Sequence, residues 1–105
     1  MAQIRYEVKA DRMACRTGNI AIEYMCNNVV SGISSTRAKY YIYFVINPDS
    51  NPDSNPSNIY DIYKIKTKVL KQLVGNCRSV SGGDGNRSKM YLLKIKDILE
   101  YKINV

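Results

Sequence analysis

Residues 7–39 read EVKADRMACRTGNIAIEYMCNNVVSGISSTRAK, and this stretch decides which fold the chain can adopt. Apolar and polar side chains alternate along residues 3–11, and again along residues 19–25 after a turn at residues 16–19. Alternation with a period of two is typical of a β-strand that has one face toward a core. We therefore expect two neighbouring strands joined as a hairpin, with Asp11 and Glu23 both on the less apolar face of their strands.

The rest of the chain predicts further strands and two helices. The other expected elements are a short helix beginning at Ser34, Ser35 or Thr36, strands at 40–46 and 58–66, a helix from Thr67 to a stop at Gly75, a hairpin turn at Gly82–Asn86 and a strand at 89–95. A short helical turn and a last extended segment follow in the tail. This β-β-α-β-β-α-β order predicts an α/β fold with one mixed sheet flanked by two short helices.

One internal repeat interrupts this pattern. Residues 47–58 read NPDSNPDSNPSN, a four-residue unit that recurs nearly three times. Asn, Pro, Asp and Ser favour turns and supply few ladder hydrogen bonds, so we expect an exposed loop between two strands. At 105 residues the whole chain, 1–105, is expected to form one domain.

The chain is basic, with 16 Lys and Arg against nine Asp and Glu and a formal net charge of +7. We expect a polyanionic partner, DNA, rather than a membrane, because no strongly amphipathic cationic helix is visible. Codon usage in an AT-rich genome produces the same Lys-, Ile-, Asn- and Tyr-rich composition, so the charge alone leaves both interpretations open. No apolar run approaches the about 20 residues of a membrane span. A cytoplasmic location is expected, or an intracellular one in the host if the source is viral.

The absence of histidine restricts the available chemistry. A His-based triad, a His-ligated metal and a His general base are excluded. The three cysteines have no CxxC spacing and indicate neither a disulfide framework nor a zinc site. Carboxylates, main-chain carbonyls and water remain as metal ligands, and Mg²⁺ or Mn²⁺ prefers that set. Asp11, Glu23 and the carbonyl of Tyr24 are the candidates, although two acids on neighbouring strands are by themselves more often solvated surface side chains.

One run of residues resembles a known group of enzymes. TGN-x-x-x-E, residues 17–23, is followed by SGIS at residues 31–34, with Asp11 before the run and Thr36, Ala38 and Tyr41 after it. This pattern resembles small phage- and virus-type nucleases of the PD-(D/E)XK superfamily, which includes Holliday junction resolvases. The resemblance covers residues 7–95. It implies a restriction-endonuclease-like mixed sheet and a metal-dependent DNA endonuclease that hydrolyses phosphodiester bonds, with structure selectivity left open.

The resemblance also implies roles for individual residues. Asp11 corresponds to the first metal-binding acid and Glu23, twelve residues later, to the second. The superfamily places a lysine two residues after the second acid, where this chain has Met25. Arg37 and Lys39 are expected to replace that lysine, followed by Lys9. Glu7 is expected to supply an additional acid in or near the site. The residues expected to contact DNA are Arg16, Ser34, Arg37, Lys39, Arg87 and Lys89.

The expected function is that of a Mg²⁺- or Mn²⁺-dependent deoxyribonuclease. A homodimer is expected, because a single domain of this size has a small footprint on DNA. The alternative is a catalytically inactive nucleic-acid-binding module of the same fold, which Met25 favours. A third possibility is an interaction protein whose basic composition has no functional meaning.

Overall fold

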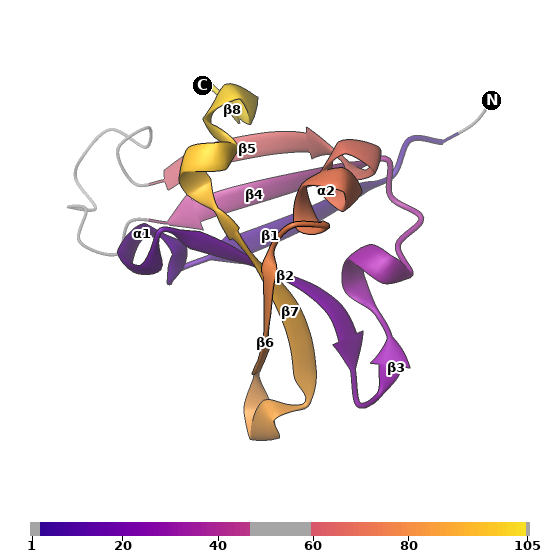
Figure 1. Cartoon of the computed structure of the whole chain (residues 1–105). Coiled ribbons are helices and arrows are strands. Elements are labelled where there is room, and N and C mark those ends of the chain that lie inside the picture. The colour runs from indigo at the N-terminus through magenta and orange to yellow at the C-terminus, as the bar shows by residue number, and fades with distance from the viewer. Residues whose placement is uncertain (1–2, 47–59, 105) are drawn as a thin grey trace.

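The computed structural model contains two four-stranded sheets, so the prediction of a single mixed sheet is wrong (Figure 1). The structure describes residues 3–46 and 60–104, and the predicted loop at 47–58 lies outside them. The first sheet has the order β1-β4-β5-β8 and the second β3-β2-β7-β6. The strands are β1 (Tyr6–Asp11), β2 (Asn19–Cys26), β3 (Val29–Val30), β4 (Tyr40–Ile46), β5 (Tyr60–Lys66), β6 (Arg78–Gly82), β7 (Ser88–Lys94) and β8 (Lys102–Ile103).

The helical elements are short, and the α/β class with two short helices is confirmed. They are α1 (Ala14–Thr17), α2 (Thr67–Val74) and the 3-10 turns η1 (Gly32–Ser34), η3 (Asp84–Asn86), η4 (Ile95–Asp97) and η5 (Leu99–Tyr101). No helix within residues 3–46 and 60–104 is long and apolar enough to cross a membrane.

Strand β4 is central to the first sheet. Its sequence YYIYFVI alternates in burial, with Tyr41, Tyr43 and Val45 buried and the intervening side chains partly exposed. Strand β1 runs parallel to β4 on one side, and β5 runs antiparallel to it on the other. The predictions of a strand at 40–46 and of its partner at 58–66 are confirmed over the described residues.

The predicted hairpin of residues 3–11 and 19–25 is wrong, because these strands belong to different sheets. Strand β1 pairs with β4, whereas β2 pairs with β3 and β7. The chain turns out of the first sheet through α1, which ends at Gly18 in a left-handed conformation with φ 75°. Local alternation predicts a strand but does not determine which strand it pairs with, and β1 pairs along its whole length with the aromatic strand β4.

The predicted helix after Ser34 is also wrong. Only the turn η1 forms there, and residues 35–39 run on as an irregular segment. The backbone donors that a helix would use are taken elsewhere. The Ala38 N–H donates to the Thr36 hydroxyl at 3.0 Å, and the Lys39 N–H donates to the Arg5 carbonyl at 2.8 Å. The Thr36 hydroxyl and the carbonyl of Arg5, just before β1, therefore take the place of the acceptors of helical i→i−4 bonds.

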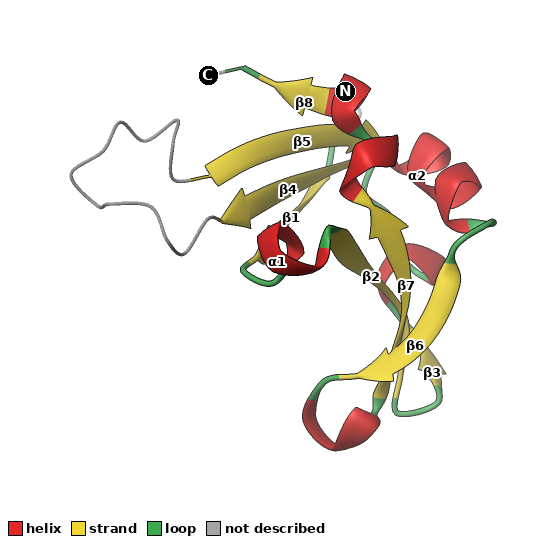
Figure 2. Cartoon of the chain, turned by 60° about the vertical axis from the view of Figure 1, so that its left-hand side comes forward, coloured by secondary structure: helices red, strands yellow, loops and turns green. Residues whose placement is uncertain are grey.

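The later elements agree with expectation. Helix α2 begins at Thr67, as predicted, with Lys66 as its N-cap, and it ends at Gly75. Strands β6 and β7 form the glycine-rich hairpin around residues 82–86. In Figure 2 this hairpin and β3 extend away from the first sheet, whereas the opposite end of the second sheet packs beneath it.

The core lies where the two sheets and α2 meet. Ile20, Ile22 and Leu93 come from the second sheet, and Leu70 and Val74 come from α2. All five are at most 6% exposed. They pack with the buried tyrosines of β4 in one cluster. The two sheets are thus held together by one apolar core, which fixes the relative positions of the residues on β1 and β2.

Candidate functional site

Asp11 and Glu23 come from different sheets but line the same hollow of about 260 Å³. Asp11 is the last residue of β1, and Glu23 lies in the middle of β2. The remaining wall is made by Lys9, Ala10, Ala21, Gly32, Tyr41 and Tyr43. We call this space the acid hollow. The structure therefore brings together the two acids that the sequence paired, by packing two sheets rather than by a hairpin.

The Asp11 carboxylate is held by the start of the next element. Its Oδ1 accepts hydrogen bonds from the backbone N–H groups of Met13 and Ala14, both at 2.9 Å. These donors belong to the turn that enters α1, so the aspartate both caps that turn and ends β1. No further donor to the carboxylate occurs among the described residues, which leaves Oδ2 available to a ligand.

The Glu23 carboxylate is held by two serine hydroxyls. Ser31 donates to Oε2 at 3.0 Å, and Ser88 donates to Oε1 at 2.9 Å. Ser31 follows β3, and Ser88 begins β7. Each carboxylate oxygen keeps a second lone pair, so the serines orient the group without occupying all of its acceptor capacity. The SGIS motif contained Ser31, but no local pattern pointed to Ser88, which is 65 residues from Glu23.

Gly32 packs directly against the backbone of Glu23. Its φ is 50°, and a Cβ placed on it would collide with the Glu23 carbonyl oxygen. Only glycine combines this left-handed conformation with such a close approach. The glycine of the SGIS motif therefore allows η1 to lie against β2 and carries Ser31 to the Glu23 carboxylate.

Two buried tyrosines of β4 form the inner wall of the acid hollow. Tyr41 and Tyr43 are each 2% exposed. Burial raises the pKa of both hydroxyls. Neighbouring carboxylates raise the pKa further, Glu7 and Glu23 at Tyr41, and Asp11 and Glu7 at Tyr43. Both tyrosines are therefore neutral at ordinary pH.

The Tyr41 hydroxyl has no hydrogen-bond partner although it is buried. Thr36 lies close enough to oppose the rise in the pKa of Tyr41, but no hydrogen bond of good geometry joins the two hydroxyls. Leaving a buried hydroxyl unpaired costs about 1–3 kcal/mol.

Lys9 is the basic residue that lines the acid hollow. It lies two residues before Asp11 on the same strand. Arg37 and Lys39, ranked ahead of Lys9 from the sequence, line other hollows instead. That ranking assumed a helix through residues 34–39, whereas the observed irregular segment runs beside the start of β1.

Glu7 lies beside the acid hollow rather than in its wall. Together with Arg5, Ser35, Thr36 and Arg37 it lines an adjoining hollow of about 370 Å³, which shares Gly32 with the acid hollow. Its carboxylate is near enough to raise the pKa of both buried tyrosines.

Tyr24 directly follows Glu23 at an irregularity in the pairing of β2 with β7. Its carbonyl oxygen accepts the Ser31 N–H at 3.1 Å, so one lone pair of this predicted metal ligand is already used. Its side chain stacks on Tyr91 and bonds Ser79 through the hydroxyl at 2.6 Å.

The other residues predicted to contact DNA lie outside the acid hollow. Arg16 is exposed on α1, Ser34 is exposed at the end of η1, and Arg87 and Lys89 are exposed on the β6–β7 hairpin. Of the basic side chains in the described ranges, only Lys102 forms an ion pair, with Asp61 at 3.2 Å. The positive charge is therefore largely uncompensated over the part of the chain that is described.

The oxygen ligands that line the acid hollow are of the kind that a hard divalent cation prefers. Asp11 and Glu23 provide two carboxylates with unused lone pairs that line the same space. No group of three or more His, Cys, Asp or Glu side chains that could hold a metal occurs among residues 3–46 and 60–104. Water and substrate oxygens would have to complete the coordination, which is usual for Mg²⁺.

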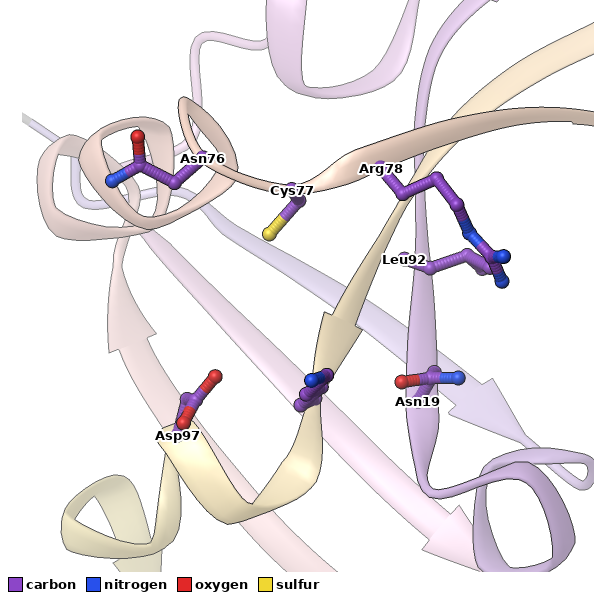
Figure 3. A pocket seen from close by; sticks show the side chains of 7 residues that line it. Asn19, Asn76, Cys77, Arg78, Leu92 and Asp97 are labelled. Carbon is purple, nitrogen blue, oxygen red and sulfur yellow. The ribbon is translucent and has the colours of Figure 1, made fainter.

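A separate hollow of about 520 Å³ lies near the end of α2 and contains none of the residues predicted from the sequence (Figure 3). It is lined by Asn19, Asn76, Cys77, Arg78, Leu92, Lys94 and Asp97. Burial and the charge of Asp97 raise the pKa of the Cys77 thiol, which donates to the Leu73 carbonyl at 3.3 Å. The raised pKa favours the protonated thiol over the nucleophilic thiolate, and Asp97 is the acid among the residues that line this hollow.

In comparisons with known proteins, no family model, no curated protein and no solved structure matches the chain.

Proposed function

We propose that this chain is a Mg²⁺- or Mn²⁺-dependent endonuclease that hydrolyses phosphodiester bonds in DNA. The observation that carries the proposal is the acid hollow, where Asp11, Glu23 and Lys9 line one space although they come from two sheets. The resemblance of residues 7–95 to PD-(D/E)XK nucleases supports the same activity and a restriction-endonuclease-like arrangement of the sheets.

Each residue has a role that follows from its placement. Asp11 and Glu23 would hold the cation with their unused lone pairs, and Ser31 and Ser88 keep the Glu23 carboxylate in one orientation. When bound, the ion would polarise a phosphoryl oxygen and make water more acidic. The Lys9 ammonium group would orient the attacking water and offset the negative charge that develops on the phosphate.

The alternative is a catalytically inactive module that binds nucleic acid through the same surface. Met25 favours it, because this residue has no charge and occupies the position of the lysine in the nucleases that the chain resembles. Lys9 in the acid hollow favours the enzyme, because it supplies a cation from another strand.

The experiment compares cleavage and binding in matched variants. Supercoiled, linear and branched DNA are incubated with Mg²⁺ or Mn²⁺ and the wild type, Asp11→Asn or Glu23→Gln. These substitutions preserve shape and remove one negative charge each. The expected result is wild-type cleavage and a loss of at least about 100-fold in each variant, with binding in EDTA retained.

Two outcomes would contradict the proposal in different ways. Cleavage that survives both substitutions would remove Asp11 and Glu23 as the site. Binding without cleavage by the wild type in either metal would favour the inactive module.

We further propose that two copies act together as a homodimer and that the protein works inside the cell. A single 12.0 kDa domain has a small footprint on DNA, and a second copy would offer one acid hollow to each strand.

A further inference from the structure

A strongly basic hollow of about 480 Å³ lies between the segment 36–39 and the start of α2. Four cations line it, namely Arg37, Lys39, Lys68 and Lys71, and no carboxylate does. The segment and the helix are joined there by a hydrogen bond from the Thr67 N–H to the Lys39 carbonyl at 2.8 Å. We call this space the basic hollow. Four like charges around one space repel one another, and an anion bound between them would offset this repulsion by attraction to all four.

The first turn of α2 adds to this electrostatic imbalance. The N-cap residue, Lys66, makes no side-chain capping bond, and the turn contains no acid. The first N–H groups of a helix lack acceptors within the helix, and its N-terminus is a centre of partial positive charge. An acid is favoured there, yet this chain has lysine at positions 66 and 68. The helix start is suited to an anion from outside the chain.

The Thr67 hydroxyl is an independent sign of a missing ligand. Thr67 lines the basic hollow and is only 7% exposed, and its hydroxyl has no hydrogen-bond partner. An unpaired buried hydroxyl destabilises the protein, so such groups are nearly always satisfied. A phosphate oxygen in the basic hollow would supply the missing partner.

We propose that the basic hollow binds a phosphate group of a nucleic-acid strand, held by Lys68, Lys71 and the N-terminus of α2. The Thr67 hydroxyl donates to it, and Arg37 and Lys39 approach it from the opposite wall. Nothing in the sequence had singled out Lys68, Lys71 or Thr67 for this role.

The basic hollow has lining residues in common with a hollow that lies next to the acid hollow. It shares Thr36, Arg37 and Ala38 with the hollow that contains Arg5 and Glu7, and that hollow shares Gly32 with the acid hollow. A strand that follows these spaces places one phosphate at α2 while another lies beside Asp11 and Glu23. This relation to cleavage rests on the proposed function, whereas the phosphate site depends only on its own residues.

The test measures binding of a fluorescent DNA duplex in EDTA, where cleavage does not occur. Lys68→Ala/Lys71→Ala is compared with Lys64→Ala/Lys96→Ala, which removes two exposed lysines outside the basic hollow. The first double variant is expected to lose on the order of tenfold in affinity relative to the second. Its slope of log affinity against log salt should also become shallower by roughly 0.9 for each phosphate that the variant no longer neutralises. Equal losses in the two variants would mean that only net charge matters, and the site would be rejected.

Thr67→Val provides a second test that does not depend on charge. Valine keeps the shape and removes the unpaired hydroxyl, so the free protein should melt a few degrees higher. The same variant should bind DNA more weakly and gain less thermal stability from added inorganic phosphate than the wild type. A lower melting temperature with unchanged affinity would show that the hydroxyl serves the fold alone, and would overturn the proposal.

The same experiments separate the possible failures. If inorganic phosphate raises the melting temperature through Thr67 but DNA does not bind, the ligand is a small phosphate compound and the nucleic-acid assignment is wrong. If the Lys68 and Lys71 effects appear but no metal supports cleavage, the nuclease proposal fails and the phosphate site stands.

Discussion

At the scale of the residue, Lys9 is the side chain that we propose for the role of the lysine in the PD-(D/E)XK pattern. The lysine of the PD-(D/E)XK pattern would follow Glu23 on β2, where this chain has Met25. Lys9 reaches the same hollow from β1, in a different sheet, because its strand position places it beside Asp11. Stabilising the phosphate during hydrolysis requires a positive charge close to it, not a lysine at a particular position in the sequence. The packing of the two sheets can therefore place a lysine from another strand there.

Lys9→Met is predicted to lower the rate of DNA cleavage by about 100-fold or more, because it removes the cation that lines the acid hollow with Asp11 and Glu23. The folded state should be little affected, since Lys9 is exposed. Single-turnover kinetics with saturating enzyme measure this step.

Arg37→Met and Lys39→Met serve as matched controls for Lys9→Met. Both should weaken DNA binding and leave the single-turnover rate within a few-fold of the wild type. A larger loss of rate in either control than in Lys9→Met would restore the ranking suggested by the sequence.

Tyr43 links stability to alkaline pH. Its pKa is raised in the folded state, so its contribution to stability is fully present below pH 10 and is lost as the pH rises toward the folded-state pKa. The free energy of unfolding should therefore fall above about pH 10, by up to about 1.4 kcal/mol per pH unit for this one proton.

Tyr43→Phe should flatten that alkaline decline, because phenylalanine has no proton to lose. Urea unfolding followed at several values between neutral and alkaline pH provides the measurement. Tyr60→Phe, at the end of the β4–β5 ladder and only partly buried, is the control. Parallel declines in the wild type and Tyr43→Phe would argue against a buried neutral Tyr43.

At the scale of elements, the turn η1 and strand β2 depend on one close contact. Gly32→Ala is expected to destabilise the fold by about 3 kcal/mol, because it combines a left-handed backbone with a collision against the Glu23 carbonyl. Gly18→Ala has a similar φ of 75° but open space around the new Cβ. It should cost only about 1–2 kcal/mol. Urea unfolding measures the free energy of unfolding of both variants. Equal decreases would mean that the close contact of Gly32 with the Glu23 carbonyl does not contribute to the difference.

Helix α2 is stable despite the poor chemistry of its first turn. Lys66→Asp should raise the free energy of unfolding by about 1 kcal/mol, because Lys66 has the extended backbone of an N-cap and aspartate can bond the orphan N–H groups. DNA binding should weaken at the same time if the helix start holds a phosphate. Lys64→Asp makes the same charge change within β5 and should give no gain in thermal unfolding experiments.

At the scale of the whole molecule, the small footprint of one domain on DNA favours the association of two copies. The net charge of +7 on each copy opposes that association. Two copies repel each other in low salt, and DNA neutralises that charge when it binds. The proposed homodimer should therefore be favoured by DNA and by moderate salt. Sedimentation equilibrium should give a protein mass of twice 12.0 kDa under those conditions. A single-copy mass throughout would exclude the dimer.

Local patterns were sufficient for most of the elements. Period-two alternation predicted β4, β5 and β7, and helical spacing of apolar residues predicted α2, because these signals depend on neighbours along the chain. The turn at Gly82–Asn86 was predicted for the same reason. The helix after Ser34 could not be excluded locally, since the bonds that replace it reach back to Arg5.

The sequence by itself determined that Asp11 and Glu23 are candidate ligands and that the strands alternate, since residue identity and period are properties of the chain alone. Only the tertiary structure decided that the strands of these two acids lie in different sheets, and that Lys9 rather than Arg37 or Lys39 accompanies them. It also decided that Ser31 and Ser88 hold Glu23 and that four cations gather at α2. The physical reason is that strand pairing and core packing join residues far apart in the chain, through contacts that no short stretch encodes.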